Sequence, residues 1–112
     1  MNQAQALLWS LAVEVPVVLA LGRGVDRRRL LGVALAATLL THPFAIAGFA
    51  ALQPHLSYPA RAAVVESAVA LAEGALLWQA AGLPAGRAWG AAAAANAASY
   101  LSGLALRTYL LR

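Results

Sequence analysis

Three of the four acidic residues of this 112-residue chain lie within long apolar segments. They are Glu14, Glu66 and Glu73, whereas Asp26 falls in a polar connector. Carboxyl groups in apolar surroundings can take up protons or bind cations. A charged side chain at the centre of a bilayer costs at least about 2.5–3.5 kcal/mol. We therefore expect the three glutamates to face the interior of the molecule, a water-filled cavity or a partner.

Neutral polar groups and one histidine lie at matching depths in these segments. With a rise of about 1.5 Å per helical residue, the depths fall into two layers, at roughly 10–13 Å and 17–23 Å from the arginine-rich edge. A stripe of this kind suits a proton relay or a cation path. The simpler hypothesis is that the amides and hydroxyls only join helices through hydrogen bonds. The first layer holds Glu14, Thr38, Glu73 and Asn96, and the second holds Thr41, His42, Glu66 and Ser99.

A divalent metal ion is the one cofactor that the sequence suggests. His42, Glu66, Glu73 and Glu14 offer the nitrogen and oxygen ligands of hydrolytic metal sites. An intramembrane metal-dependent enzyme is therefore an alternative function. It is the less favoured one, because the apolar segments contain a single histidine and no HExxH motif, and Ser99 has no established base beside it.

Four apolar runs must position these side chains. They cover residues 4–21, 30–52, 62–81 and 88–106, and a bilayer core needs roughly 20 helical residues. The chain is 62% hydrophobic and 11% charged, against about 45–50% and about 25% in soluble domains. The runs lack the alternation of barrel strands. We predict an all-α fold: one polytopic membrane domain over residues 1–112, with four transmembrane helices in a compact bundle.

The arginines predict an orientation in the membrane. Five lie in the first and third connectors, at positions 23, 27–29 and 87, against Arg61, Arg107 and Arg112 on the other side. The positive-inside rule then places these two connectors in the cytoplasm and both termini outside the bacterial inner membrane. Trp9, Trp78 and Trp89 lie near the ends of the runs, as in an aromatic belt.

The remaining composition excludes some partners and suggests others. The chain has no cysteine, so disulfides and thiolate sites are excluded. Its net charge is +4, but the arginines do not gather on one folded face, and we expect no nucleic-acid partner. The lipid bilayer is the expected surrounding. Because 112 residues leave little room for a full pathway, a homodimer or a larger membrane partner is expected, including the case of a non-catalytic subunit.

Short motifs along nearly the whole chain resemble a family of small proteins. The motifs are Val13-Glu14-Val15-Pro16, Thr41-His42-Pro43, the pair Glu66 and Glu73, and Asn96-Ala97-Ala98-Ser99. They are similar to those of uncharacterised four-helix integral membrane proteins of bacteria. That family has no established activity, so the resemblance implies a shared polar site and little more.

A second resemblance is to the small multidrug-resistance exporters. These have a similar length, four helices and a proton-linked glutamate in the first helix, to which Glu14 would correspond. The resemblance implies proton-linked export as another alternative. Where the exporters carry a lysine near the end of helix 1, this chain has Gly22-Arg23. It also lacks their aromatic and glycine motif in helix 3, where it has Glu66 and Glu73.

Overall fold

The chain folds into four helices, which confirms the all-α prediction. The computed structural model describes residues 2–110, without the side chains of residues 107, 109 and 110. Arg112 and the side chain of Arg107, which entered the orientation argument, thus lie outside the described residues. The helices are α1 (Gln3–Leu21), α2 (Arg27–Leu52), α3 (Tyr58–Gln79) and α4 (Ala85–Leu110).

Local capping sets where the helices begin. The Asn2 side chain accepts from the backbone N–H of Gln5 at 2.8 Å, while the Gln5 side chain accepts from the backbone N–H of Asn2 at 3.0 Å. Asp26 caps α2 through the backbone N–H of Arg28 at 3.1 Å. Because of that cap, α2 begins three residues before the apolar run. Helix α3 begins four residues before its run, with Pro59 in the first turn, where proline is tolerated.

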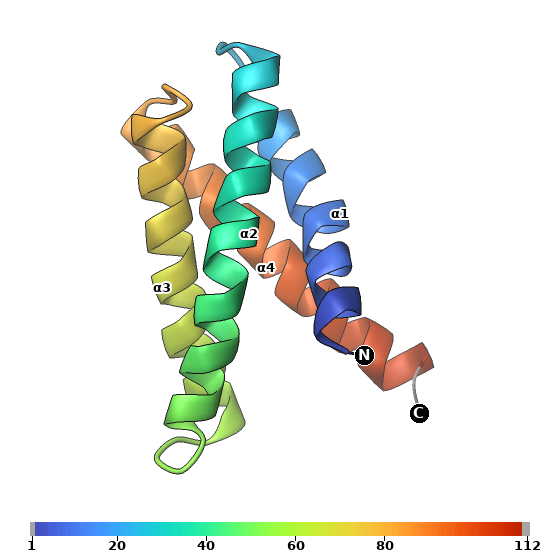
Figure 1. The fold of residues 1–112 in the computed structure, drawn as a ribbon. Helices are drawn as coiled ribbons and strands as arrows, with labels where there is room; N and C mark the ends of the chain where they lie inside the picture. The colour runs from blue at the N-terminus through green and yellow to red at the C-terminus, as the bar shows by residue number, and fades with distance from the viewer. Residues whose placement is uncertain (1, 111–112) are drawn as a thin grey trace.

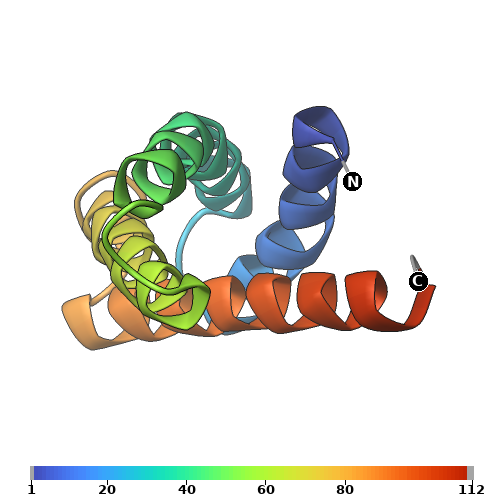
Figure 2. The same cartoon turned by 90° about the horizontal axis from the view of Figure 1, so that it is seen from below.

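The helices form a four-sided bundle (Figure 1). Helix α1 packs against α2 and α4, and α3 packs against α2 and α4. Among residues 2–110, the backbones of the diagonal pairs, α1 with α3 and α2 with α4, do not come close. The view from below shows α4 running across the bundle beneath the other three helices (Figure 2). The centre is thus left to side chains that reach across the diagonals.

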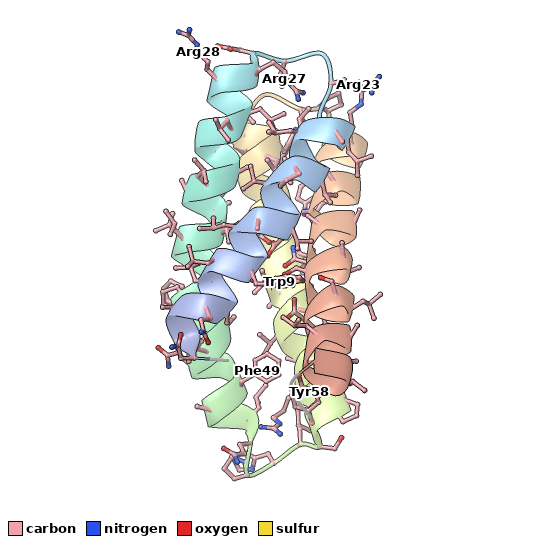
Figure 3. All side chains as sticks on the ribbon, turned by 90° about the vertical axis from the view of Figure 1, so that its right-hand side faces the viewer. Trp9, Arg23, Arg27, Arg28, Phe49 and Tyr58 are labelled. Carbon is pink, nitrogen blue, oxygen red and sulfur yellow. The ribbon has the colours of Figure 1, made fainter. Side chains whose placement is uncertain are left out.

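The connectors lie at two opposite ends of the bundle. The α1–α2 and α3–α4 connectors share one end, and the α2–α3 connector lies at the other (Figure 1). At the shared end Arg29 donates to the carbonyl oxygen of Ala80, and Arg87 donates to that of Arg23 at 2.6 Å. These bonds tie neighbouring connectors together. We call this the arginine end; Arg23, Arg27 and Arg28 lie there, far from Phe49 and Tyr58 (Figure 3).

Buried apolar side chains fill the half of the bundle next to the arginine end. Leu30, Leu77 and Leu83 are the largest side chains that are fully buried. Alanines from α4 complete this core, so α4 comes close to its neighbours. The members of the core are Val15, Val18, Leu30, Ala34, Leu77, Ala81, Leu83, Ala88, Ala91, Ala92 and Ala95.

Two of the four helices are long and apolar enough to cross a membrane. They are α1 and α2, each with a mean hydropathy of 1.8 over its most apolar stretch. Among residues 2–110 no other helix meets the same criterion. Glu66 and Glu73 lower the hydropathy of α3, and α4 contains more alanine than leucine.

Candidate functional site

Two buried carboxyl groups meet near the middle of the bundle. Glu14 of α1 and Glu73 of α3 are hydrogen-bonded to each other across a diagonal of the bundle. Both residues are buried, at 6% and 5% exposure. An ionised carboxylate has no hydrogen to donate, so a bond between two carboxyl groups requires a proton on one of them. The arrangement therefore suits a pair that holds one proton between its two members, and in that form the pair carries one negative charge.

Hydrogen bonds from the other two helices hold Glu73 in place. The Asn96 side-chain amide of α4 donates to Glu73 Oε1 at 2.5 Å and to the Ala92 carbonyl at 2.8 Å. The Thr38 hydroxyl of α2 donates to Glu73 Oε2 at 3.3 Å. All four helices thus contribute a side chain to one buried group, and these are the four residues that the sequence places in its first layer.

A cavity of about 230 Å³ extends from this buried group toward the α2–α3 connector. Glu14, Thr38 and Asn96 line its inner end, and Phe49 and Tyr58 line its outer end. Thr38 and Phe49 are eleven residues apart in α2, which corresponds to a depth of about 16 Å. The full lining is Ala6, Trp9, Ser10, Glu14, Thr38, Thr41, His42, Ala45, Ile46, Phe49, Tyr58, Glu66, Val69, Asn96, Ser99, Tyr100, Gly103 and Leu104.

The carboxyl pair separates this cavity from a much smaller one. The second cavity has a volume of about 10 Å³ and lies between Glu14, Glu73 and the apolar core. A volume of that size is close to the minimum for a single water molecule. Beyond it, Leu30, Leu77 and Leu83 fill the bundle as far as the arginine end. The larger cavity thus lies on one side of the pair, and packed apolar side chains lie on the other.

The second predicted layer lines the cavity wall without forming one connected network. Glu66 and His42 both face the cavity, but in the described part of the chain the buried Nε2 atom of His42 has no hydrogen-bond partner. Thr41 donates to the Thr38 carbonyl of its own helix at 3.4 Å. The Ser99 hydroxyl lies within hydrogen-bonding distance of both Glu14 and Ser10, with its Oγ 3.3 Å from Ser10 Oγ. The inner layer is thus joined to the wall through α4 rather than through His42.

The candidate metal ligands are not gathered into one cluster. Within residues 2–110, no group of three or more histidine, cysteine or acidic side chains has the arrangement to hold a metal ion. Glu14 and Glu73 adjoin each other, while His42 and Glu66 lie along the wall of the cavity. Of the four candidate ligands, the structure thus brings only Glu14 and Glu73 next to each other.

Several residues that build the cavity lie outside the sequence prediction. Ser10 lies four residues before Glu14, and that spacing on a helix could have pointed to it. Trp9, which the sequence places near the end of an apolar run, donates its indole N–H to Ser102 of α4 at 3.0 Å. Phe49 and Tyr58 stack with ring centroids 5.8 Å apart. Aromatic residues near the ends of apolar runs fit an interface equally well, so their pattern alone does not separate these two roles.

Comparison of the chain with protein-family models, with curated proteins and with solved structures gave no match.

Proposed function

We propose that the chain spans the bilayer four times and exchanges a proton for a cation at the Glu14–Glu73 pair. The observation that carries the proposal is the position of this pair. Glu14 lines the inner end of a cavity that extends toward one end of the bundle, and the buried carboxyl group of Glu73 lies directly behind it. Intramembrane acids that face an interior cavity are typical of proton and ion pathways.

The distribution of polarity supports a membrane location for all four helices. The buried residues include Glu14, Glu73 and Asn96, whereas Leu8 and Phe44 are 65% and 77% exposed. The buried polar side chains of α3 and α4 point inward. A hydropathy average over either helix therefore understates how apolar its outer surface is. The bundle is 41 Å long, close to the full thickness of a bilayer, about 40–45 Å. On α3 and α4, the exposed apolar residues include Val64, Leu71, Leu101 and Leu104.

The arginine end belongs in the cytoplasm under this proposal. Its two connectors carry Arg23, Arg28 and Arg87, which the positive-inside rule assigns to the cytoplasmic face of a bacterial inner membrane. The cavity then opens toward the outer face, where the α2–α3 connector and both termini lie.

Exchange of one proton for one monovalent cation leaves the charge of the Glu14–Glu73 site unchanged. A monovalent cation that reaches the inner end of the cavity takes the place of the shared proton, which passes to cavity water. The charge of the site is the same before and after the exchange. Transport then requires the layer of Leu30, Leu77 and Leu83 to open in a second conformation. Pro16 and Pro43 remove backbone hydrogen bonds from α1 and α2, which makes these helices the easier ones to bend.

Vesicles with a trapped pH dye test this proposal. The purified protein is reconstituted, the membrane potential is clamped, and a gradient of sodium, potassium or tetramethylammonium chloride is imposed. We expect at least one gradient to change the lumen pH in wild-type vesicles but not in vesicles with Glu73→Gln. Asp26→Asn makes the same chemical change outside the cavity and should retain the signal.

Two outcomes would contradict the proposal. One is that, with each of the three cations in turn, wild-type vesicles change their lumen pH no more than empty vesicles do. The other is a Glu73→Gln response equal to that of the wild type in protein that inserts and elutes as a single species.

A further inference from the structure

The arginine end carries most of the positive charge of the protein. Its two connectors and the helix turns beside them hold five of the eight arginines, at positions 23, 27–29 and 87, against one acidic residue, Asp26. All five arginines are exposed. The Asp26 carboxylate accepts from the backbone N–H of Arg28, so it acts as a helix cap. This end of the bundle is therefore an exposed surface with an excess of positive charge.

Three of these arginines are held in place by backbone carbonyl groups. Arg27 donates to a carbonyl in the last turn of α1 at 2.6 Å, and Arg29 donates to the carbonyl of Ala80. Arg87 donates to the carbonyl of Arg23 at 2.6 Å. Each bond uses one of the five N–H groups of a guanidinium and leaves the others for a second acceptor. Because the side chains are already fixed, they lose less conformational entropy when an anion binds.

The fold brings together arginines that are far apart in the sequence. Arg87 follows Arg23 by 64 residues, and its Nη1 atom lies 3.5 Å from the position that a Cβ atom would take at Gly24. The side chains of Arg23, Arg27 and Arg28 project at the same end of the bundle (Figure 3). At this end the arginines do gather, contrary to the expectation from the sequence.

This end lies at the depth of the lipid headgroups if the bundle spans the membrane. The bundle is 41 Å long, whereas the hydrocarbon core of a bilayer is about 30 Å thick and the headgroup layers bring the total to about 40–45 Å. The two ends of the bundle then fall within the headgroup layers, where the lipid phosphates lie. A guanidinium group can form two parallel hydrogen bonds with a phosphate group. All eight basic side chains other than histidine are arginines.

We propose that the arginine end binds the phosphate groups of anionic phospholipids in the adjacent leaflet. This inference shares the membrane location with the proposed function but does not depend on proton exchange. The headgroup of an anionic phospholipid contains no cation to balance its phosphate. Charge complementarity with the five arginines therefore favours it over a zwitterionic phospholipid.

Binding of radiolabelled phosphatidylglycerol to the immobilised protein in neutral detergent micelles tests the inference. We expect saturable binding that unlabelled phosphatidylglycerol displaces and phosphatidylcholine does not. Arg23→Gln combined with Arg28→Gln should weaken binding by about 30-fold, since each arginine near an anionic surface contributes about fivefold. Neither side chain makes the carbonyl bonds described above. Arg61→Gln removes the same charge at the opposite end of the bundle and should leave binding unchanged.

High salt gives a second measurement that requires no variant. Sodium chloride at 1 M shortens the Debye length to about 3 Å, so the affinity of the wild-type protein for phosphatidylglycerol should fall. Binding that is insensitive to this salt, or equal displacement by phosphatidylglycerol and phosphatidylcholine, would overturn the inference. Displacement of the label by millimolar inorganic phosphate would assign the site to free phosphate and would overturn the lipid assignment.

The outcomes separate the lipid site from the proposed function. Selective binding of phosphatidylglycerol by a protein that shows no proton exchange in vesicles supports the lipid site and contradicts the exchange. Proton exchange by a protein without this lipid preference does the reverse. Equal loss of affinity in the Arg61 variant and in the combined Arg23 and Arg28 variant argues against the lipid site at the arginine end.

Discussion

At the scale of single residues, Glu73 organises the buried polar group. Its two carboxyl oxygens accept from Asn96 and Thr38, and Glu14 completes the set from the opposite side. A buried carboxyl group is stable only when its oxygens have partners, because an unsatisfied buried polar group costs about 1–3 kcal/mol. The surrounding amide and hydroxyl thus act as more than general links between helices: they fix the position of one particular acid.

Replacement of Thr38 by valine should destabilise the protein through the loss of this bond. Thr38→Val keeps the side-chain shape and removes the hydroxyl that donates to Glu73. We expect the free energy of unfolding in detergent micelles to fall by about 0.5–1.5 kcal/mol. Thr41→Val is the matched control, since the hydroxyl of Thr41 is also buried but donates to the Thr38 carbonyl of its own helix. Equal effects of the two substitutions would mean that the bond to Glu73 contributes nothing to stability.

The sequence predicts the depth of these residues well and their partners poorly. Helical rise is fixed, so counting residues from the arginine-rich edge places Glu14, Thr38, Glu73 and Asn96 at one level. Which side chains meet at that level depends on how each helix is rotated, and uniformly apolar runs carry little information on rotation. For this reason His42, expected with Glu66 in one outer layer, lines the same cavity but is left with an unpartnered Nε2.

At the scale of elements, the packing of α3 on α4 depends on one close contact. A methyl group at Gly74 would come within 2.1 Å of the Trp89 ring. The indole N–H of Trp89 donates to the Leu71 carbonyl of α3 at 3.1 Å, so the ring is held against the glycine. The sequence places Trp89 near the end of an apolar run, and it does not show that the ring also packs on the neighbouring helix.

Alanine substitutions at two helical glycines should have opposite effects. Gly74→Ala must displace the rigid Trp89 ring, and we expect a loss of about 1–3 kcal/mol in the free energy of unfolding. Gly32 lies in α2 with open space around the added atom. There the helix preference of alanine should stabilise the protein by about 0.5–1 kcal/mol. Unfolding in detergent micelles, followed by circular dichroism, measures both. A stabilising effect at Gly74 would argue against the packing described for α3 and α4.

At the scale of the whole molecule, the bundle has two chemically different ends. The arginine end is closed by an apolar core and by hydrogen bonds between connectors, and the opposite end is reached by a cavity with aromatic and acidic walls. The number of helices and their approximate positions follow from the apolar runs. The cavity at one end does not, because its shape depends on how the four helices are rotated and tilted, which the apolar runs do not specify.

Cysteine labelling tests the proposed orientation. The chain contains no cysteine, so single substitutions give a clean signal. Gly86→Cys places a thiol at the arginine end, and His55→Cys places one in the α2–α3 connector; both positions are exposed. In intact cells, a maleimide that does not cross membranes should label position 55 and leave position 86 unlabelled until the membrane is permeabilised. Labelling of position 86 alone in intact cells would indicate the opposite orientation. If neither position is labelled after permeabilisation, the two connectors do not lie at the membrane surfaces.

The proposed exchange requires a proton on the Glu14–Glu73 pair. Infrared spectroscopy of the protein in lipid detects such a proton directly. A protonated carboxyl group has a C=O stretching band that a carboxylate lacks. We predict that the wild-type protein shows this band and that both Glu14→Gln and Glu73→Gln displace it, because each substitution changes the hydrogen-bond partner of the acid that remains. Asp26→Asn should leave it in place. A spectrum without a protonated carboxyl band, or a band that neither glutamine substitution moves, would contradict the account.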